Sequence, residues 1–165
     1  MSITLREITP ANFKECINLK VGAAQSAFVA SNLMSIAQSK IYPTYNPAAV
    51  YAGDEMVGFA MFGLDEDDGR YYLGRIMIDE RCQGKGYGRA AVLAVIEKLR
   101  ENPDCRAIYL SFVPGNTSAE TLYKSVGFEA TGEINEGEIV MRLDLENNAN
   151  PKSEIQNRTD VSRNF

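Results

Sequence analysis

The chain has 165 residues, of which 45% are hydrophobic, and its formal net charge is −5 at pH 7. A chain of this length and composition suits one domain with a sizeable hydrophobic core. The acidic balance argues against nucleic acid and anionic membrane surfaces as partners, because both bind basic protein faces. It is compatible with a cationic substrate.

The N-terminal part of the chain predicts one strand and two helical regions. Residues 3–8 alternate apolar and polar side chains, which indicates a strand. Pro10 suits the start of a helix, and apolar residues follow at helical spacing. Residues 21–39, rich in Ala and Ser, predict a second, weaker helical region. Residues 41–47 contain two prolines, which predict a loop.

The remaining predicted strands are short apolar or alternating runs bounded by turn residues: 48–53, 56–64, 70–78, 106–112, 128–134 and 138–145. Two helices separate them, a long one that ends near Glu101 and a short one from Asn116 through Tyr123. Hairpins mixed with strand–helix–strand units predict an α/β or α+β fold with a mixed sheet. We expect one domain over residues 1–145 and a polar tail over residues 146–165.

Histidine is absent and the three cysteines show no Cys-x-x-Cys spacing, so no metal site is expected. Acid–base chemistry must then come from Tyr, Glu, Asp, Lys, Cys or water. The N-terminal segment lacks the apolar core of a signal peptide, and no apolar run approaches the ~20 residues of a membrane span. We therefore expect free thiols and a cytoplasmic protein.

The segment RCQGKGYGR, residues 81–89, breaks local stability rules between a predicted strand and a predicted helix. Glycine costs about 0.5–1 kcal/mol relative to alanine, and cations oppose the dipole at a helix N-terminus. A bound phosphate would offset both costs, because glycines let backbone N–H groups turn toward an anion. The spacing fits neither a P-loop, which needs a following Ser or Thr, nor the G-x-G-x-x-G loop of dinucleotide folds.

Two motifs resemble those of the GNAT family of N-acetyltransferases. The run RCQGKGYG matches that family's R/Q-x-x-G-x-G/A loop, and NTSAETLYKSVGF, residues 116–128, is similar to its N-x-x-A-x-x-x-Y-x-x-x-G-F motif. Over residues 3–145 the chain looks most like the bacterial spermine/spermidine acetyltransferases, through QSAFVASN, VGFAMFG and IDERCQGKG. The resemblance implies a mixed, largely antiparallel sheet of about seven strands with flanking helices. It also implies acetyl-CoA as co-substrate.

The resemblance implies that residues of the glycine loop, the preceding strand and the following motif bind acetyl-CoA. The glycine loop would hold the pyrophosphate of acetyl-CoA through Gln83, Gly84, Lys85, Gly86, Tyr87, Gly88 and Arg89. The main chain of Ile76, Met77 and Ile78 would pair with the pantetheine arm, and one N–H group would polarise the thioester carbonyl. Asn116 is expected as a helix N-cap and a pantetheine contact. Lys124 is either a contact of a CoA phosphate or a solvated lysine.

Tyr123 is the expected general acid. The leaving thiolate needs a proton, and a phenol with a pKa of about 10 can supply one to a thiol with a pKa of about 8.5. The alternative is that Tyr123 is part of the core. The general base stays open between a carboxylate acting through water and binding of the neutral amine. Asp79 and Glu80 lie nearby in sequence but also fit loop positions.

The expected acceptor is a small cationic amine, such as the polyamines spermidine and spermine. The acidic turn at residues 65–68 either flanks the acceptor groove or is a solvated turn, and no acidic residue lies between Glu15 and Asp54. Polyamine relatives carry a Glu where this chain has Ala30. An aromatic, hydrogen-bonding pocket is the other arrangement, formed by Gln25, Phe28, Tyr42 and Tyr45.

The sequence leaves other functions open. The acceptor could be a protein N-terminus, a lysine or an aminoglycoside, and the chain could bind acyl-CoA without catalysis. The family resemblance allows a homodimer through the C-terminal strands.

Overall fold

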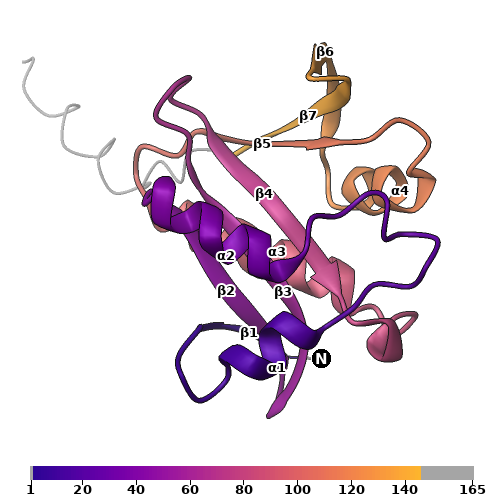
Figure 1. Cartoon of the computed structure of the whole chain (residues 1–165). Helices are drawn as coiled ribbons and strands as arrows, with labels where there is room; N and C mark the ends of the chain where they lie inside the picture. Colours follow the sequence, from indigo (N-terminus) through magenta and orange to yellow (C-terminus); the bar gives the residue numbers. More distant parts are fainter. Residues whose placement is uncertain (1, 146–165) are drawn as a thin grey trace, which may run out of the picture.

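The computed structural model describes residues 2–145, which form a seven-stranded sheet flanked by helices (Figure 1). The strands are β1 (Ile3–Glu7), β2 (Tyr45–Ala52), β3 (Glu55–Leu64), β4 (Tyr71–Ile78), β5 (Ala107–Phe112), β6 (Glu129–Asn135) and β7 (Glu138–Asp144). The helices are α1 (Phe13–Asn18), α2 (Asn32–Ile41), α3 (Tyr87–Arg100) and α4 (Thr117–Ser125), with a 3-10 turn at Glu80–Cys82. This architecture confirms the predicted fold class. The predicted tail, residues 146–165, lies outside the described residues.

The sheet parts in its middle. The strand order is β1-β2-β3-β4-β5-β7-β6, and every neighbouring pair is antiparallel except β4 and β5. These two parallel strands pair only at Tyr71–Ile108 and Tyr72–Tyr109. Just beyond, Gly74 has no partner in the β3–β4 register, which marks a bulge. The C-terminal halves of β4 and β5 therefore diverge and leave a gap in the sheet.

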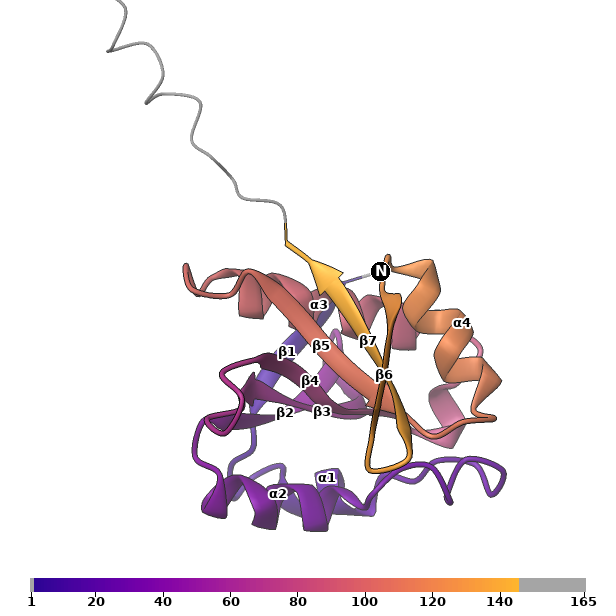
Figure 2. The same cartoon turned by 90° about the horizontal axis from the view of Figure 1, so that it is seen from above.

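Helices cover the two faces of the sheet separately, with α3 on one face and α1 and α2 on the other (Figure 2). The α3 face holds the larger core, into which the helix buries a stripe of apolar side chains: Ala91, Val92, Val95, Ile96 and Leu99. Burying a side chain of valine size or larger contributes roughly 1.5–3 kcal/mol. A second core under α1 and α2 includes Cys16, Phe59 and Met77. β4 is thus held from both faces where it borders the gap.

Two predictions about the N-terminal half are wrong. Of residues 21–39, which were expected to be helical, only residues 32–39 lie in a helix, α2, and residues 23–28 form turns. Ser31 starts the helix, because its extended backbone cannot continue a helix from upstream and its Oγ accepts the Met34 N–H at 3.2 Å. β2 begins at Tyr45, inside the expected loop. Pro47 fits this strand because β1 pairs only as far as Ala48.

Within residues 2–145, no helix is long and apolar enough to span a membrane. All three cysteines are buried free thiols. The described part of the chain contains no group of three or more Cys, Asp or Glu side chains arranged to hold a metal ion.

Candidate active site

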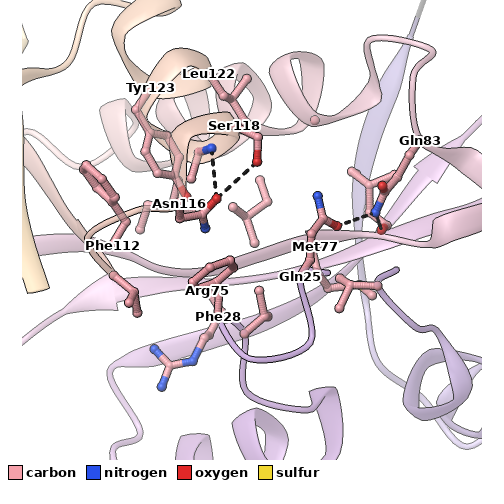
Figure 3. A pocket seen from close by; sticks show the side chains of 18 of the residues that line it. Gln25, Phe28, Arg75, Met77, Gln83, Phe112, Asn116, Ser118, Leu122 and Tyr123 are labelled. Carbon is pink, nitrogen blue, oxygen red and sulfur yellow. Dashed lines mark hydrogen bonds between the residues drawn. The ribbon is translucent and has the colours of Figure 1, made fainter. Parts of the chain in front are cut away.

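A cavity of ≈ 650 Å³ lies where β4 and β5 part (Figure 3). Its walls come from β4, the end of β5, the glycine loop, the start of α4 and the loop of residues 21–30. Past Tyr72, β4 has β3 as a partner on one side only. Backbone groups on its other side are therefore available to an extended ligand, which could pair with the strand as an added strand would.

The glycine loop has the geometry of an anion site. Gly84 and Gly86 have φ angles of 75° and 81°, in the left-handed region that favours glycine. In the described residues, the N–H groups of Gly84, Lys85 and Gly86 have no hydrogen-bond acceptor. Gly86 also stands at the N-terminal end of α3, whose first-turn N–H groups have no intrahelical acceptor. This set of donors fits a pyrophosphate, and the parted strands fit an extended arm.

The structure places most of the predicted site residues around one cavity. Ten of them line it: Ile76, Met77, Ile78, Gln83, Gly84, Gly86, Tyr87, Gly88, Asn116 and Tyr123. The three predicted cationic ligands do not. Lys85 and Arg89 are exposed beside the loop, and Lys124 pairs with Glu120 at 2.5 Å. Contacts of these cations with CoA phosphates stay predictions.

Asn116 caps α4 and also borders the cavity. Its Oδ1 accepts hydrogen bonds from the Ala119 N–H at 3.3 Å and from Ser118 Oγ at 3.1 Å (Figure 3). This confirms the predicted N-cap. Its Nδ2 has no acceptor in the part of the chain that the structure describes, so this amide remains able to donate into the cavity.

Tyr123 belongs to the main core and also lines the cavity. The side chain is 8% exposed, and its ring centroid lies 6.2 Å from that of Phe112 and 6.1 Å from that of Phe128. The Tyr123 Oη has no hydrogen-bond partner among residues 2–145. Every fully buried side-chain N or O atom in this range has a partner, so the Tyr123 Oη is not fully buried. Tyr123 is also one of the residues that line the cavity. Burial, with the negative charge of Glu138, raises the pKa of Tyr123 to about 12.

Asp79 has a structural role. This carboxylate is 2% exposed and accepts hydrogen bonds from Arg81 Nε at 2.7 Å, the Arg81 N–H at 3.1 Å and the Lys20 N–H at 3.1 Å. Burial would raise the pKa of Asp79, but these hydrogen bonds lower it below the usual value. Through these hydrogen bonds Asp79 joins the end of β4 to the segment after α1 and starts the 3-10 turn. It does not line the cavity.

The acidic turn is a solvated turn and does not flank the cavity. Asp65 accepts hydrogen bonds from the Asp67 N–H and Tyr45 Oη, and Asp68 accepts them from the Arg70 N–H and Tyr72 Oη. The predicted aromatic pocket is half right. Gln25 and Phe28 line the cavity, whereas Tyr42 and Tyr45 do not.

The cavity lining also includes polar and charged residues that were not predicted, among them Arg75, Ser111 and Glu138. Arg75 donates to the Gly74 carbonyl at 2.7 Å. Ser111 Oγ donates to Glu138 Oε2. The sequence carries one partial signal, since alternation along β7 puts Glu138 on the face opposite Ile139 and Met141. It does not show that this face borders a cavity.

Comparisons with known proteins agree with this geometry. Residues 22–128 match the model of the acetyltransferase (GNAT) family. The chain is 38% identical over 152 residues to the spermine/spermidine N(1)-acetyltransferase of Bacillus subtilis strain 168, covering 88% of this chain and 100% of that one. It is 37% identical over 152 residues, with the same coverage, to a probable spermine N(1)-acetyltransferase of Bacillus subtilis subsp. natto strain BEST195.

Solved structures share the fold. AAC(6')-Ib in complex with ribostamycin and coenzyme A superposes with a TM-score of 0.72 at 19% identity, over 87% of this chain and 94% of that one. A Bacillus subtilis acetyltransferase in complex with CoA superposes with a TM-score of 0.63 at 19% identity, over 87% of this chain and 98% of that one. Together with the family match and the two sequence relatives, the fold shows that the chain belongs to the GNAT family and is an acetyl-CoA-dependent N-acetyltransferase.

Proposed function

We propose that the protein transfers the acetyl group of acetyl-CoA to a primary amine of a small cationic acceptor, with polyamines such as spermidine and spermine as the first class. One observation carries the proposal: Tyr123, whose hydroxyl has no partner among the described residues, lines the cavity between the parted strands. The names of the two relatives, which refer to spermine and spermidine, support the acceptor class.

The cavity suits both parts of the co-substrate. Acetyl-CoA, when bound, supplies the reactive acetyl thioester. The N–H groups from Gly84 to Gly88 and the N-terminus of α3 would hold its pyrophosphate. The free side of β4 at Ile76–Ile78 would pair with the pantetheine arm, and one of its N–H groups would stabilise the negative charge that develops on the thioester oxygen.

The proposed reaction is direct attack in a ternary complex. An alkylammonium has a pKa of about 10.4, so the acceptor must first lose one proton to water. The amine nitrogen then bonds to the thioester carbon while the carbon–sulfur bond breaks. Tyr123 gives its proton to the departing sulfur, and the second N–H proton, released as the amide forms, restores the phenol. The raised pKa keeps Tyr123 protonated at neutral pH.

A protein N-terminus or a lysine side chain is the second candidate acceptor. Arg75 lines the cavity, and its guanidinium, which donates to the Gly74 carbonyl, has no carboxylate partner within the described residues. A cation in this wall disfavours acceptors with several positive charges and suits a peptide carbonyl or carboxylate.

The test is acetyl-CoA turnover with parallel acceptors, followed by thiol release against a blank of enzyme alone. Spermidine, spermine, putrescine, lysine, a short peptide and an aminoglycoside cover the candidates. We expect the highest kcat/KM with spermidine or spermine. Turnover of the peptide alone would replace the polyamine proposal with the second candidate, and turnover of no amine would contradict both.

A further inference from the structure

Glu138 lines the cavity from the start of β7. It is the first residue of β7, and the tip of the β6–β7 hairpin extends toward the side of the sheet that α1 and α2 cover (Figure 2). Ile139 and Met141 pack into the core on the α3 side, so alternation turns Glu138 to the opposite face. The same argument applies to Ser111, between the core residues Leu110 and Phe112.

The carboxylate of Glu138 is oriented by a hydrogen bond. It is half-buried, and its Oε2 accepts the hydrogen bond from Ser111 Oγ. The strand register brings the two together, because Ser111 pairs with Val140 and Phe112 with Ile139. Its Oε1 has no hydrogen-bond donor among residues 2–145, which leaves that oxygen free for a ligand in the cavity.

No other carboxylate within the described residues lines this cavity. Asp65, Asp68 and Asp79 each accept hydrogen bonds from protein groups elsewhere. Glu138 is also near the expected reaction centre, since its charge acts on Tyr123. Tyr123 reaches the cavity from α4, whereas Glu138 reaches it from the face opposite the main core. An amine held by Glu138 would therefore approach the thioester from the side opposite the proton donor.

We propose that Glu138, held in place by Ser111, binds the ammonium group of the acceptor amine. The inference rests on the proposed function and names the residue that selects a cationic acceptor. An ammonium group offers three donors, and a hydrogen bond between two charged groups is about twice as strong as one between neutral groups.

The test compares Glu138→Gln with Glu136→Gln. Both substitutions remove one negative charge from the same hairpin, but Glu136 is exposed and does not line the cavity. We expect Glu138→Gln to raise the KM of spermidine about 10- to 100-fold, the usual effect of losing a charged hydrogen bond, while Glu136→Gln changes it less than twofold. Glu138→Asp should recover part of the loss. Calorimetric affinity for CoA should stay within twofold in all three variants.

A second readout does not depend on turnover. Spermidine titrated into the CoA-loaded protein should bind Glu138→Gln about 10-fold or more weakly than the wild type. Equal affinities, or equal KM values in Glu138→Gln and Glu136→Gln, would overturn the inference while leaving amine acetylation by the wild type intact. Wild-type protein that acetylates no amine would instead contradict the proposed function, and the titration would still decide the role of Glu138.

Discussion

Gln83 Nε2 donates a hydrogen bond to Gln25 Oε1 at 2.8 Å, and this bond joins the loop expected to bind the cofactor to the opposite wall of the cavity (Figure 3). Gln83 also donates to the Ile78 carbonyl at 3.0 Å, which ties the start of the glycine loop to the end of β4. The 21–30 loop contributes Phe28 and Ala30 to the cavity wall. The two halves of the proposed site are thus mechanically linked through one pair of amide side chains.

Removing each partner of this pair should have a different effect. Gln25→Ala loses one hydrogen bond, worth about 1 kcal/mol or roughly fivefold in affinity. It should raise the KM of the amine, while the glycine loop stays tied to Ile78 and CoA affinity changes less than twofold. Gln83→Ala loses both bonds and should weaken both ligands. Steady-state kinetics and CoA calorimetry measure the two effects, and identical profiles for the two variants would show that the link does not act in this way.

Gly86→Glu should abolish CoA binding, because it places a negative charge beside the pyrophosphate and an L side chain at a φ angle of 81°. Two variants separate these causes. Gly86→Asn keeps the site neutral with a residue that tolerates this backbone, and it should retain most of the affinity. Gly53→Glu strains a remote turn with a φ angle of 62° and should leave CoA binding unchanged. Near-normal CoA affinity of Gly86→Glu by calorimetry would remove the loop from the cofactor site.

The free energy of unfolding should fall in alkaline solution because Tyr123 has a higher pKa in the folded protein than in the unfolded chain. Its pKa is raised from 10.0 to about 12 in the folded protein, by burial first and by Glu138 second. Between these values the unfolded chain loses a proton that the folded protein keeps, so the stabilisation present below pH 10 disappears as the pH rises through 12. The expected loss is about 2–3 kcal/mol.

In Tyr123→Phe, the part of the fall in unfolding free energy that comes from the phenol should be absent. Cys16, whose pKa burial raises from 9.0 to about 11, contributes a loss between these values in both proteins and serves as an internal control. Urea unfolding at pH 9, 10, 11 and 12 measures the difference. Parallel curves for the wild type and Tyr123→Phe would show that the phenol titrates normally when folded.

Ala30→Glu should improve binding of a polycation. Ala30 lines the cavity on the 21–30 loop, and this stretch of chain has no acidic residue. A partly exposed carboxylate typically adds about 0.2–1 kcal/mol of attraction, which would lower the KM of spermidine up to about fivefold. The gain should shrink as salt is added. Ala30→Gln, with similar shape and no charge, is the control, and equal KM values for the two variants would argue against a cationic acceptor beside this loop.

The sequence predicts the strands, the long helix and the cofactor half of the site, because these depend on local patterns. Apolar periodicity marks β3, β4 and α3, and the spacing of Gly84, Gly86, Asn116 and Tyr123 carries the family motifs. Confirmation of the N-cap at Asn116 shows the same principle, since a cap depends on residues three positions apart.

The acceptor half depends on distant contacts that no local pattern contains. Glu138 looks like an ordinary hairpin residue until the β5–β7 register places Ser111 beside it. Pro47 looks like a strand breaker until the end of β1 leaves that side of β2 unpaired. The cations Lys85 and Lys124 look like phosphate ligands by sequence position alone, and only the structure shows that they lie outside the cavity lining.

The most direct test of the proposed mechanism is the turnover number of Tyr123→Phe with acetyl-CoA and spermidine both saturating. The ring contacts with Phe112 and Phe128 remain in this variant, so only the hydroxyl is lost. We predict that kcat falls about 10²- to 10⁴-fold, the range for loss of a positioned acid, while calorimetric CoA affinity stays within twofold. An unchanged kcat would contradict the account, because the proton would then reach the sulfur without Tyr123.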